Sequence, residues 1–393
     1  MHLTRQVEFI LKRLNESGHR ADVVGGPVRD FLRGVAPSDY DITTSALPEE
    51  TKAVFSDCKT VDTGIKHGTV TLVLDGEPYE ITTWRIDGEY KDARHPESVS
   101  FTKSIVEDLA RRDFTMNAIS YNPNDGITDP FLGSEDIKNR IIRAVGDPYL
   151  RFSEDALRIL RALRFSATLG FEIEKNTSEA LRSKTHLLCE ISAERIFVEW
   201  KKLLSGDFAY DIIREYADVI AVFIPALSNL RLPEKDKFAD DFLTRQAQMF
   251  YLSCDEPQTA YNESMRAMKT DTHTRTLGSQ MLENSLKYPL NNLSDAGTML
   301  CAIGEEVALA TAGLDLSLGN IDKNSYELIG EYLERGLPYR LSDLAVCGND
   351  IKALGISGRA VGELLSSLLT AVIACEVENT HDALLAYTKA KIM

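Results

Sequence analysis

The sequence predicts an α+β protein in which a mixed sheet with its helices is followed by a long all-helical remainder. Apolar β-type segments, at 21–24, 70–74 and 79–83, alternate with helical patterns over roughly the first 150 residues. From about residue 151 strand signals nearly vanish, and helical periodicity broken by Gly and Pro continues to the end. A chain of 393 residues exceeds one ordinary core. We therefore expect four parts, a head (1–145), a neck (146–205), a body (206–295) and a tail (296–393).

The elements of the head follow from local patterns. Residues 1–20 predict an amphipathic helix, because Val7, Ile10, Leu11 and Leu14 fall on one face. Two alternating segments flank Asp75-Gly76, a dipeptide typical of a tight β-hairpin. Residues 84–103 are polar and predict a loop.

The bulk composition excludes several classes of protein. The net charge of −16 argues against a general nucleic-acid binder and leaves room only for a local basic track. Six scattered cysteines include no Cys-x-x-Cys pair, so neither a zinc site nor a disulfide framework is predicted. No apolar run approaches the ~20 residues of a membrane span, and the N-terminus lacks a signal-peptide pattern. We expect a cytoplasmic protein with neither membrane nor DNA as partner.

A glycine turn and two nearby carboxylates carry the first chemical signal. Gly25 and Gly26 follow an apolar strand and open a helix, an arrangement that binds phosphate through backbone N–H groups. On a strand, Asp39 and Asp41 would point to the same side and suit a divalent metal with oxygen ligands. Arg29, just inside the helix, would hold triphosphate oxygens; the alternative is a surface arginine paired with Asp30. Phosphate and metal together predict nucleotide chemistry.

The combination, in this order, resembles the nucleotidyltransferases of the DNA polymerase β superfamily, and more closely the family of class II tRNA nucleotidyltransferases (CCA-adding enzymes) and poly(A) polymerases. The resemblance covers roughly residues 20–205. It implies a polymerase-β-like catalytic head in which Asp39 and Asp41 ligate Mg²⁺ ions that act on the 3′-hydroxyl and the triphosphate. The superfamily often uses a third carboxylate from a neighbouring strand. Our candidate is Glu80, for which a solvent-facing strand position is the alternative.

A second motif of the family is similar to the segment 111–118. There the family handles the ribose and the triphosphate, and the resemblance carries nucleotide binding to Arg111, Arg112, Asp113 and Asn117. Two adjacent arginines beside an acid are expensive to place together unless an anion compensates them.

The segment 154–164 predicts a helix with a polar face. Asp155 and Arg158, three residues apart, would present an acceptor beside donors, which complements the edges of cytosine and adenine and repels those of uracil and guanine. The family's motif is understood to read bases in this way. Arg161 continues that face, and Arg164 lies half a turn away, where it would contact phosphate or the neck. The alternative is a solvated face with Glu154 paired to Arg158.

Two further segments resemble family motifs. In residues 191–197, Ser192 reads as a helix N-cap, and Glu194 and Arg195 as supports for the base-reading helix. Residues 84–96 resemble the flexible loop that a full CCA-adding enzyme needs for the final A; an ordinary exposed loop is the alternative.

The resemblance implies template-independent addition of C, C and A to the 3′ end of tRNA from CTP and ATP, with release of pyrophosphate. The helical body and tail would hold the acceptor and TΨC arms by shape and phosphate contacts. A poly(A) polymerase and an enzyme that adds only A are the alternatives within the family. A non-catalytic RNA-binding relative would be expected to lack the aspartate pair.

Overall fold

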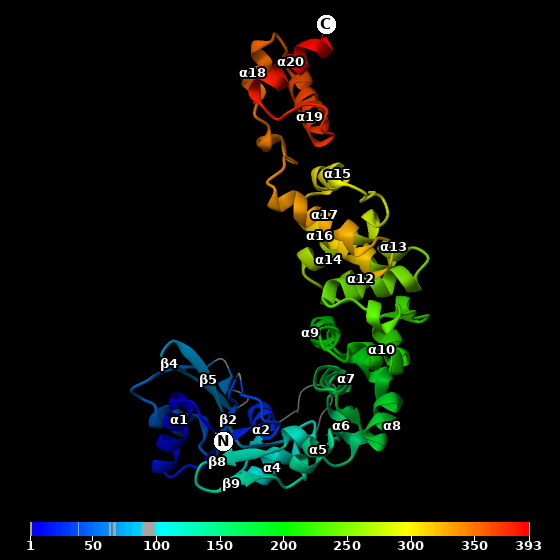
Figure 1. Cartoon of the computed structure of the whole chain (residues 1–393). Coiled ribbons are helices and arrows are strands. Elements are labelled where there is room, and N and C mark those ends of the chain that lie inside the picture. The colour runs from blue at the N-terminus through cyan, green and yellow to red at the C-terminus, as the bar shows by residue number, and fades with distance from the viewer. Residues whose placement is uncertain (1, 38, 63, 66–67, 89–98, 393) are drawn as a thin grey trace. The chain divides into compact units, whose positions relative to one another are not determined.

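The computed structural model describes two compact units, residues 1–225 and 226–393 (Figure 1). The residues that it describes are 2–37, 39–62, 64–65, 68–88 and 99–392. Most of the expected flexible loop, from 89 to 96, lies outside them.

The first unit is built on a mixed seven-stranded sheet in the order β3-β4-β5-β2-β1-β8-β9. β2 and β5 are parallel, and the other neighbouring pairs are antiparallel. The mixed sheet predicted for the head is thereby confirmed. Its strands are β1 (Ala21–Val24), β2 (Ile42–Thr44), β3 (Lys59–Val61), β4 (Thr69–Leu74), β5 (Glu77–Thr83), β8 (Ser120–Asn122) and β9 (Gly126–Thr128).

Local sequence explains the centre and one end of this sheet. All four residues of β1 are buried, as expected for a central strand. The predicted hairpin of β4 and β5 forms, and both turn residues, Asp75 (φ 52°) and Gly76 (φ 88°), adopt the positive φ angles that such a turn requires. β6 (Arg85–Asp87) pairs with β7 (Val99–Phe101) beside the sheet.

Helices complete the first unit. The predicted N-terminal helix is α1 (Arg5–Glu16), and Val7, Ile10, Leu11 and Leu14 are its buried residues. β10 (Ile141–Ile142) pairs with β11 (Glu172–Ile173), and α7 packs closely on α9. The others are α2 (Gly26–Leu32), α3 (Pro48–Val54), α4 (Ile105–Ala110), η2 (Thr115–Asn117), α5 (Gly133–Asn139), α6 (Pro148–Glu154), α7 (Leu157–Leu169), α8 (Lys175–Lys184), η3 (Thr185–Glu190), α9 (Ala193–Leu204), α10 (Ala209–Glu215) and α11 (Ala217–Phe223).

Two local expectations are wrong. Asp39 and Asp41 precede β2 rather than lying on it, because the buried, paired stretch begins only at Ile42 and both aspartates are exposed. The segment 154–164 is not one helix. Asp155 has extended angles (φ −142°, ψ 101°) and separates α6 from α7, since its carboxylate accepts a hydrogen bond from Leu157 N.

The second unit is helical throughout its described residues, as predicted. Tyr332, Met299 and Leu300 belong to one apolar cluster, and a separate cluster spans residues 344–384. The expected boundary between 295 and 296 falls inside α15, so it does not separate these clusters. The helices are η4 (Pro225–Leu227), η5 (Lys235–Lys237), α12 (Phe242–Ser253), α13 (Pro257–Ala267), α14 (Thr272–Asn284), α15 (Leu293–Ile303), α16 (Glu305–Ser317), α17 (Lys323–Glu334), η6 (Leu341–Asp343), α18 (Gly348–Ala353), α19 (Arg359–Ile373) and α20 (His381–Ile392).

All six cysteines are free thiols. In the part of the chain that is described, no helix combines the length and the apolar character needed to cross a bilayer.

Two glycines offer a matched test of packing. A Cβ at Gly133 would lie 2.0 Å from Thr115 O, whereas a Cβ at Gly330, inside α17, would meet nothing within 4 Å. We expect Gly133→Ala to destabilise the first unit by about 1–3 kcal/mol through overpacking. Gly330→Ala should stabilise its helix by up to about 1 kcal/mol. Calorimetric unfolding measures the stability of both variants. An unfolding temperature of Gly133→Ala equal to that of the parent would contradict the close contact.

Candidate active site

A glycine turn at the end of β1 forms the centre of the site. Gly25 has φ 79° and ψ −127°, a conformation that L side chains rarely adopt. A Cβ here would lie 2.9 Å from Arg112 Nη1 and 4.0 Å from Asp41 Oδ2. The Gly25 amide already donates to Ile119 O at 3.1 Å, so the residue contributes open space rather than a free N–H. A guanidinium and a carboxylate thus converge on the turn that leads into α2 at Gly26.

The two predicted metal ligands lie beside this turn. The surrounding protein removes enough water from the Asp41 carboxyl to raise its pKa; Arg112 opposes this shift and nearby Asp39 adds to it. Two carboxylates in one another's field favour a cation between them, and oxygen donors suit a hard divalent ion. Among the described residues no group of three or more His, Cys, Asp or Glu surrounds one metal position. The pair therefore fits a metal that takes its other ligands from water and substrate phosphates.

Glu80 lies on β5, the parallel neighbour of β2. The register pairs Ile42 with Ile81, so Glu80 lies opposite Asp41, one residue before the paired stretch. Residues in register on neighbouring strands point to the same face. Glu80 is exposed, and its role as a third metal ligand stays a prediction.

The adjacent arginines 111 and 112 share a partner that sequence reasoning missed. Asp108, fully buried on α4, accepts from Arg111 Nε at 3.0 Å and Arg85 N at 3.3 Å, and lies 3.8 Å from Arg112 Nη2. Burial lowers the pKa of Arg112, and the negative charge of Asp108 opposes this shift. Arg112 Nε is buried and has no hydrogen-bond partner among the described residues. Arg112 is thus under-compensated and faces the glycine turn. The spacing of three and four residues along a helix could have identified Asp108.

A chain of hydrogen bonds joins four predicted residues. Arg161 Nε donates to Asp113 Oδ2 at 2.7 Å, and Asn117 Nδ2 donates to Asp113 Oδ1 at 3.2 Å. Arg29 Nη1 donates to Asn117 Oδ1 at 2.9 Å. Arg29 also pairs with Asp30 at 3.0 Å, so that alternative pairing is present within the site. Burial disfavours ionisation of Asp113, but Arg161 overrides it and lowers the pKa of Asp113 to about 2.

The predicted base-reading residues are each bonded to another protein group. Asp155 Oδ2 accepts from Arg195 Nη2 at 3.0 Å. Arg158, 8% exposed, donates to Glu154 Oε2 at 2.6 Å and to Arg111 O at 3.1 Å. The Glu154–Arg158 pair considered as the alternative is therefore present. Asp155 and Arg158 do not lie on one helix, and their role as a reading pair stays a prediction.

α9 supports α7 through charged contacts. Arg195 reaches Asp155, as expected of a supporting residue. Arg164 Nε lies 3.0 Å from Glu199 Oε2, a contact within the neck, and binding of phosphate by Arg164 stays a prediction; Glu199 was not identified from the sequence. Ser192 occupies the predicted N-cap position of α9, but its side chain makes no capping hydrogen bond.

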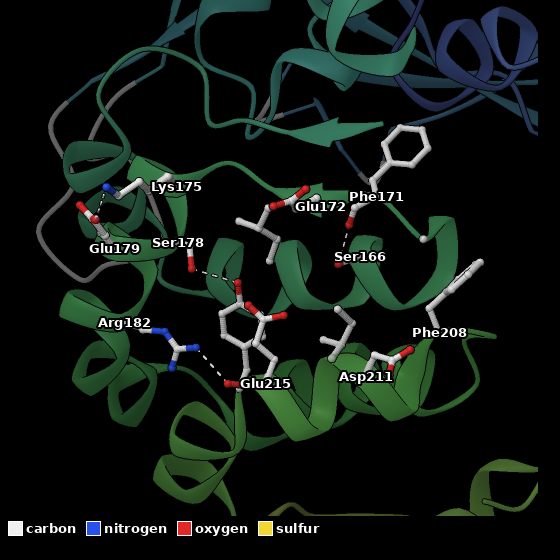
Figure 2. A pocket seen from close by; sticks show the side chains of 14 residues that line it. Ser166, Phe171, Glu172, Lys175, Ser178, Glu179, Arg182, Phe208, Asp211 and Glu215 are labelled. Carbon is white, nitrogen blue, oxygen red and sulfur yellow. Dashed lines mark hydrogen bonds and ion pairs between the residues drawn. The ribbon is translucent and has the colours of Figure 1, made fainter. Parts of the chain in front are cut away.

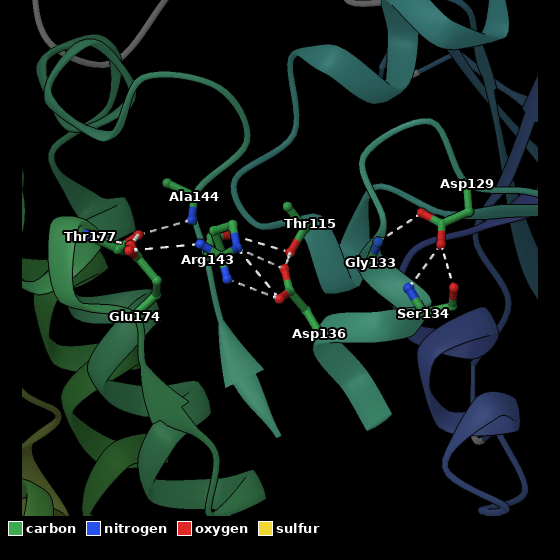
Figure 3. Close-up of polar contacts among 9 residues, drawn as sticks. All are labelled: Thr115, Asp129, Gly133, Ser134, Asp136, Arg143, Ala144, Glu174 and Thr177. Carbon is green, nitrogen blue, oxygen red and sulfur yellow. Dashed lines mark hydrogen bonds and ion pairs between the residues drawn. The ribbon is translucent and has the colours of Figure 1, made fainter. Parts of the chain in front are cut away.

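A further polar network, shown in Figure 3, links the motif turn to the neck. Thr115 Oγ1 donates to Asp136 Oδ2 at 2.6 Å, and Arg143 Nε donates to the same oxygen at 3.1 Å. Arg143 Nη1 also lies 3.6 Å from Glu174 Oε1, at the start of α8. η2, which contains Asn117, is thereby held against α5 and connected through Arg143 to the start of α8.

One cavity of the first unit lies apart from this site. It measures about 660 Å³ and lies among α7, β11, α8 and α10, lined by residues such as Ser178, Arg182 and Glu215 (Figure 2). It includes none of the residues predicted to bind nucleotide or metal. We therefore locate the site from the converging charged groups.

Two family models match parts of residues 21–228, and known proteins match most of the chain. It matches the poly A polymerase head domain over residues 21–143 and the probable RNA and SrmB-binding site of polymerase A over residues 170–228. It is 37% identical to the CCA-adding enzyme of Geobacillus kaustophilus (strain HTA426), over 96% of this chain and 95% of that enzyme. It is 48% identical to that of Geobacillus thermodenitrificans (strain NG80-2), over 57% of this chain and 55% of that enzyme.

Solved structures match over the same extent. The Bacillus stearothermophilus CCA-adding enzyme in complex with CTP has a TM-score of 0.81 and 32% identity, covering 99% of this chain and 98% of that one. The Thermotoga maritima enzyme complexed with tRNA shares the fold, with a TM-score of 0.71 and 22% identity, covering 99% and 96%. The fold is that of a nucleotidyltransferase. The chain belongs to the family of CCA-adding enzymes.

The lowered pKa of Asp113 gives a pH prediction. A folded-state pKa of about 2, below the ordinary aspartate pKa of 3.8, contributes stability that is present above pH 4 and lost as pH falls toward 2. The contribution is about 2 kcal/mol. Asp113→Asn should therefore be less stable than the parent by a constant amount above pH 5, and the difference should narrow between pH 4 and 2. Urea unfolding across this range measures it; a difference independent of pH would contradict ionised Asp113 as the stabilising species.

Proposed function

We propose that this protein adds C, C and A to the 3′ end of tRNA without a nucleic-acid template, using CTP, ATP and Mg²⁺. The observation that carries the proposal is the convergence of Asp41 and Arg112 on the Gly25 turn, within a chain similar to CCA-adding enzymes over almost its whole length. A metal-binding carboxylate and a phosphate-binding guanidinium at one point are what nucleotidyl transfer requires.

The metal supplies Lewis-acid stabilisation of the attacking oxygen and the leaving pyrophosphate when it is bound. Asp39 and Asp41 would hold it. The under-compensated guanidinium of Arg112 would take triphosphate oxygens beside Gly25. Asp113 and Asn117 hold Arg29 within the site, where its remaining donor capacity is directed toward the same phosphates.

Base selection would follow from an exchange of partners. Asp155 is bonded to Arg195, and Arg158 to Glu154. A cytosine or adenine edge offers an amine donor beside a ring-nitrogen acceptor. The amine would donate to Asp155 and the ring nitrogen would accept from Arg158, so that each side chain exchanges one hydrogen bond for another. Uracil and guanine offer a carbonyl beside N–H, which leaves the carboxylate facing an acceptor.

The remaining partners follow from the same proposal. The helical body and tail would hold the acceptor and TΨC arms of tRNA. Binding should be moderate and strongly dependent on salt, because a chain of charge −16 contacts RNA only through local cations. We also propose a cytoplasmic location.

The test of the proposal is nucleotide incorporation into three tRNA transcripts, ending before CCA, before CA and before A, with each labelled NTP offered separately. We expect CTP incorporation into the first two and ATP incorporation into the third. Long A tracts on any RNA would indicate a poly(A) polymerase, and ATP incorporation alone would indicate an A-adding enzyme. No incorporation despite tRNA binding would indicate a non-catalytic RNA-binding protein.

The metal assignment predicts that Asp39→Asn or Asp41→Asn abolishes incorporation while tRNA binding persists, because each change removes a charged oxygen ligand. Asp75→Asn is the matched control, since it makes the same change at an exposed hairpin turn. Single-nucleotide incorporation assays measure the effect. Near-parental rates in both site variants would remove these aspartates from the chemistry. Glu80→Gln, measured in parallel, decides whether a third ligand is involved.

The base-reading assignment predicts that Asp155→Ala or Arg158→Ala relaxes discrimination against UTP and GTP as well as slowing CTP and ATP. Leaving a buried group unpaired costs about 1–3 kcal/mol, or roughly ten- to a hundredfold. Asp211→Ala on α10 is the control. If the variants slow all four nucleotides equally, the two residues position the site and do not read the base.

A further inference from the structure

We propose that a second cavity of the first unit binds the phosphate of a nucleotide, with the base against an exposed phenylalanine. The cavity measures about 620 Å³ and lies between α2, α5, the C-terminal end of α7 and the segment that precedes α10. It shares no residue with the candidate active site. The inference rests on the proposed function in one respect, because that function brings both nucleotides and tRNA to this protein.

The charge of the cavity is the first argument. Its lining includes three cations, Arg33, Lys138 and Arg140, and one anion, Asp207. They come from the C-terminal ends of two helices: Arg33 directly follows α2, Lys138 lies in the last turn of α5, and Arg140 directly follows α5. The surrounding chain carries a net charge of −16, so a cavity with a cationic excess stands out against a repelling background.

Two of the three cations are already oriented by the fold. Arg33 Nη1 lies 3.1 Å from Asp30 Oδ1, and its guanidinium lies 5.7 Å from the centroid of the Phe171 ring. Arg140 Nη2 donates to Gly170 O at 3.1 Å. Lys138 is exposed and makes no ion pair with the described residues. Planar guanidinium groups held in place beside a mobile ammonium are the donors that phosphate groups take.

An aromatic wall is the second argument. Phe208 is 40% exposed, and a Cβ at Gly170 would lie 2.6 Å from its ring. The ring is therefore held in position while one side stays accessible. Phe171 and Phe208 also border the cavity of Figure 2, where they lie at the end away from Lys175 and Glu179. A fixed, exposed ring beside cations is a stacking position for a nucleobase.

The neighbouring cavity is a natural contrast. It shares the two rings but is lined by Glu172, Glu179, Asp211 and Glu215 against Lys175 and Arg182. It would repel phosphate. The two cavities thus share an aromatic wall and differ in charge, so the cations of the first one account for phosphate selectivity.

The test uses Lys138→Glu in the full-length protein. Lys138 touches neither the metal pair nor the Asp113 network, whereas Arg33 shares Asp30 with Arg29 and is less suitable. Lys175→Glu is the matched control, because this lysine is 85% exposed and makes the same charge change in the neighbouring cavity. Lys138→Arg retains the charge and should retain binding.

Two binding measurements distinguish the source of the phosphate. If an RNA strand occupies the cavity, the affinity of Lys138→Glu for a tRNA transcript lacking CCA, measured by filter binding, should fall about three- to tenfold. The slope of log K against log salt should also be reduced, by roughly 0.7–0.9. Equilibrium dialysis with ATP alone should show loss of a second bound equivalent if a free nucleotide occupies it.

An effect in either assay, absent in Lys175→Glu, supports the cavity as a nucleotide-phosphate site. Parental behaviour in both assays, or equal losses in Lys138→Glu and Lys175→Glu, would overturn it. The incorporation rate at saturating tRNA should stay unchanged in Lys138→Glu. Failure of the parent to add C, C and A would overturn the proposed function and leave both binding assays interpretable.

Discussion

The ion pair between Arg161 and Asp113 is the interaction on which the site depends. It joins the first long neck helix, α7, to the motif turn of the head, and the Asp113 side chain is only 9% exposed. The other oxygen of Asp113 binds Asn117, which in turn binds Arg29. Because the Arg161 side chain is 33% exposed, removal of one partner should cost less than the roughly 3–5 kcal/mol of a fully buried pair. The position of Arg29, which we propose to bind the triphosphate, therefore depends on a residue of the neck, and the head alone would not fix it.

Throughout the site, buried acidic side chains are paired with arginines. Asp108, Asp113 and Glu199, all buried, each hold at least one arginine. These acids make it possible to gather several guanidinium groups in a small volume of an acidic protein. Compensation is incomplete at Arg112 and at Arg164, whose buried Nε atoms make no hydrogen bond with the described residues. A substrate anion has most to gain where the protein has left a cation least satisfied.

The sequence was sufficient for features that depend on neighbouring residues. The N-terminal helix, the Asp75-Gly76 hairpin and the separation of a mixed sheet from a helical remainder all follow from local periodicity and turn chemistry. The break at Asp155 was missed, because the residue before a helix shows the same spacing as one inside it. The partnership of Asp155 with Arg195 spans 40 residues. Local patterns carry no information on such pairs, and they predicted an Asp155–Arg158 pair where the fold supplies other partners.

A double-mutant cycle on Asp113 and Arg161 tests the central claim most directly. Asp113→Asn, Arg161→Gln and the double variant would be compared by unfolding free energy and by kcat/KM for CTP. The exposed pair Arg182–Asp218 serves as the reference, where coupling should be about 0–1 kcal/mol. We predict coupling of about 1–3 kcal/mol between Asp113 and Arg161 in both measurements. Additive effects in both would show that the neck does not position the nucleotide site through this pair, and would contradict the account.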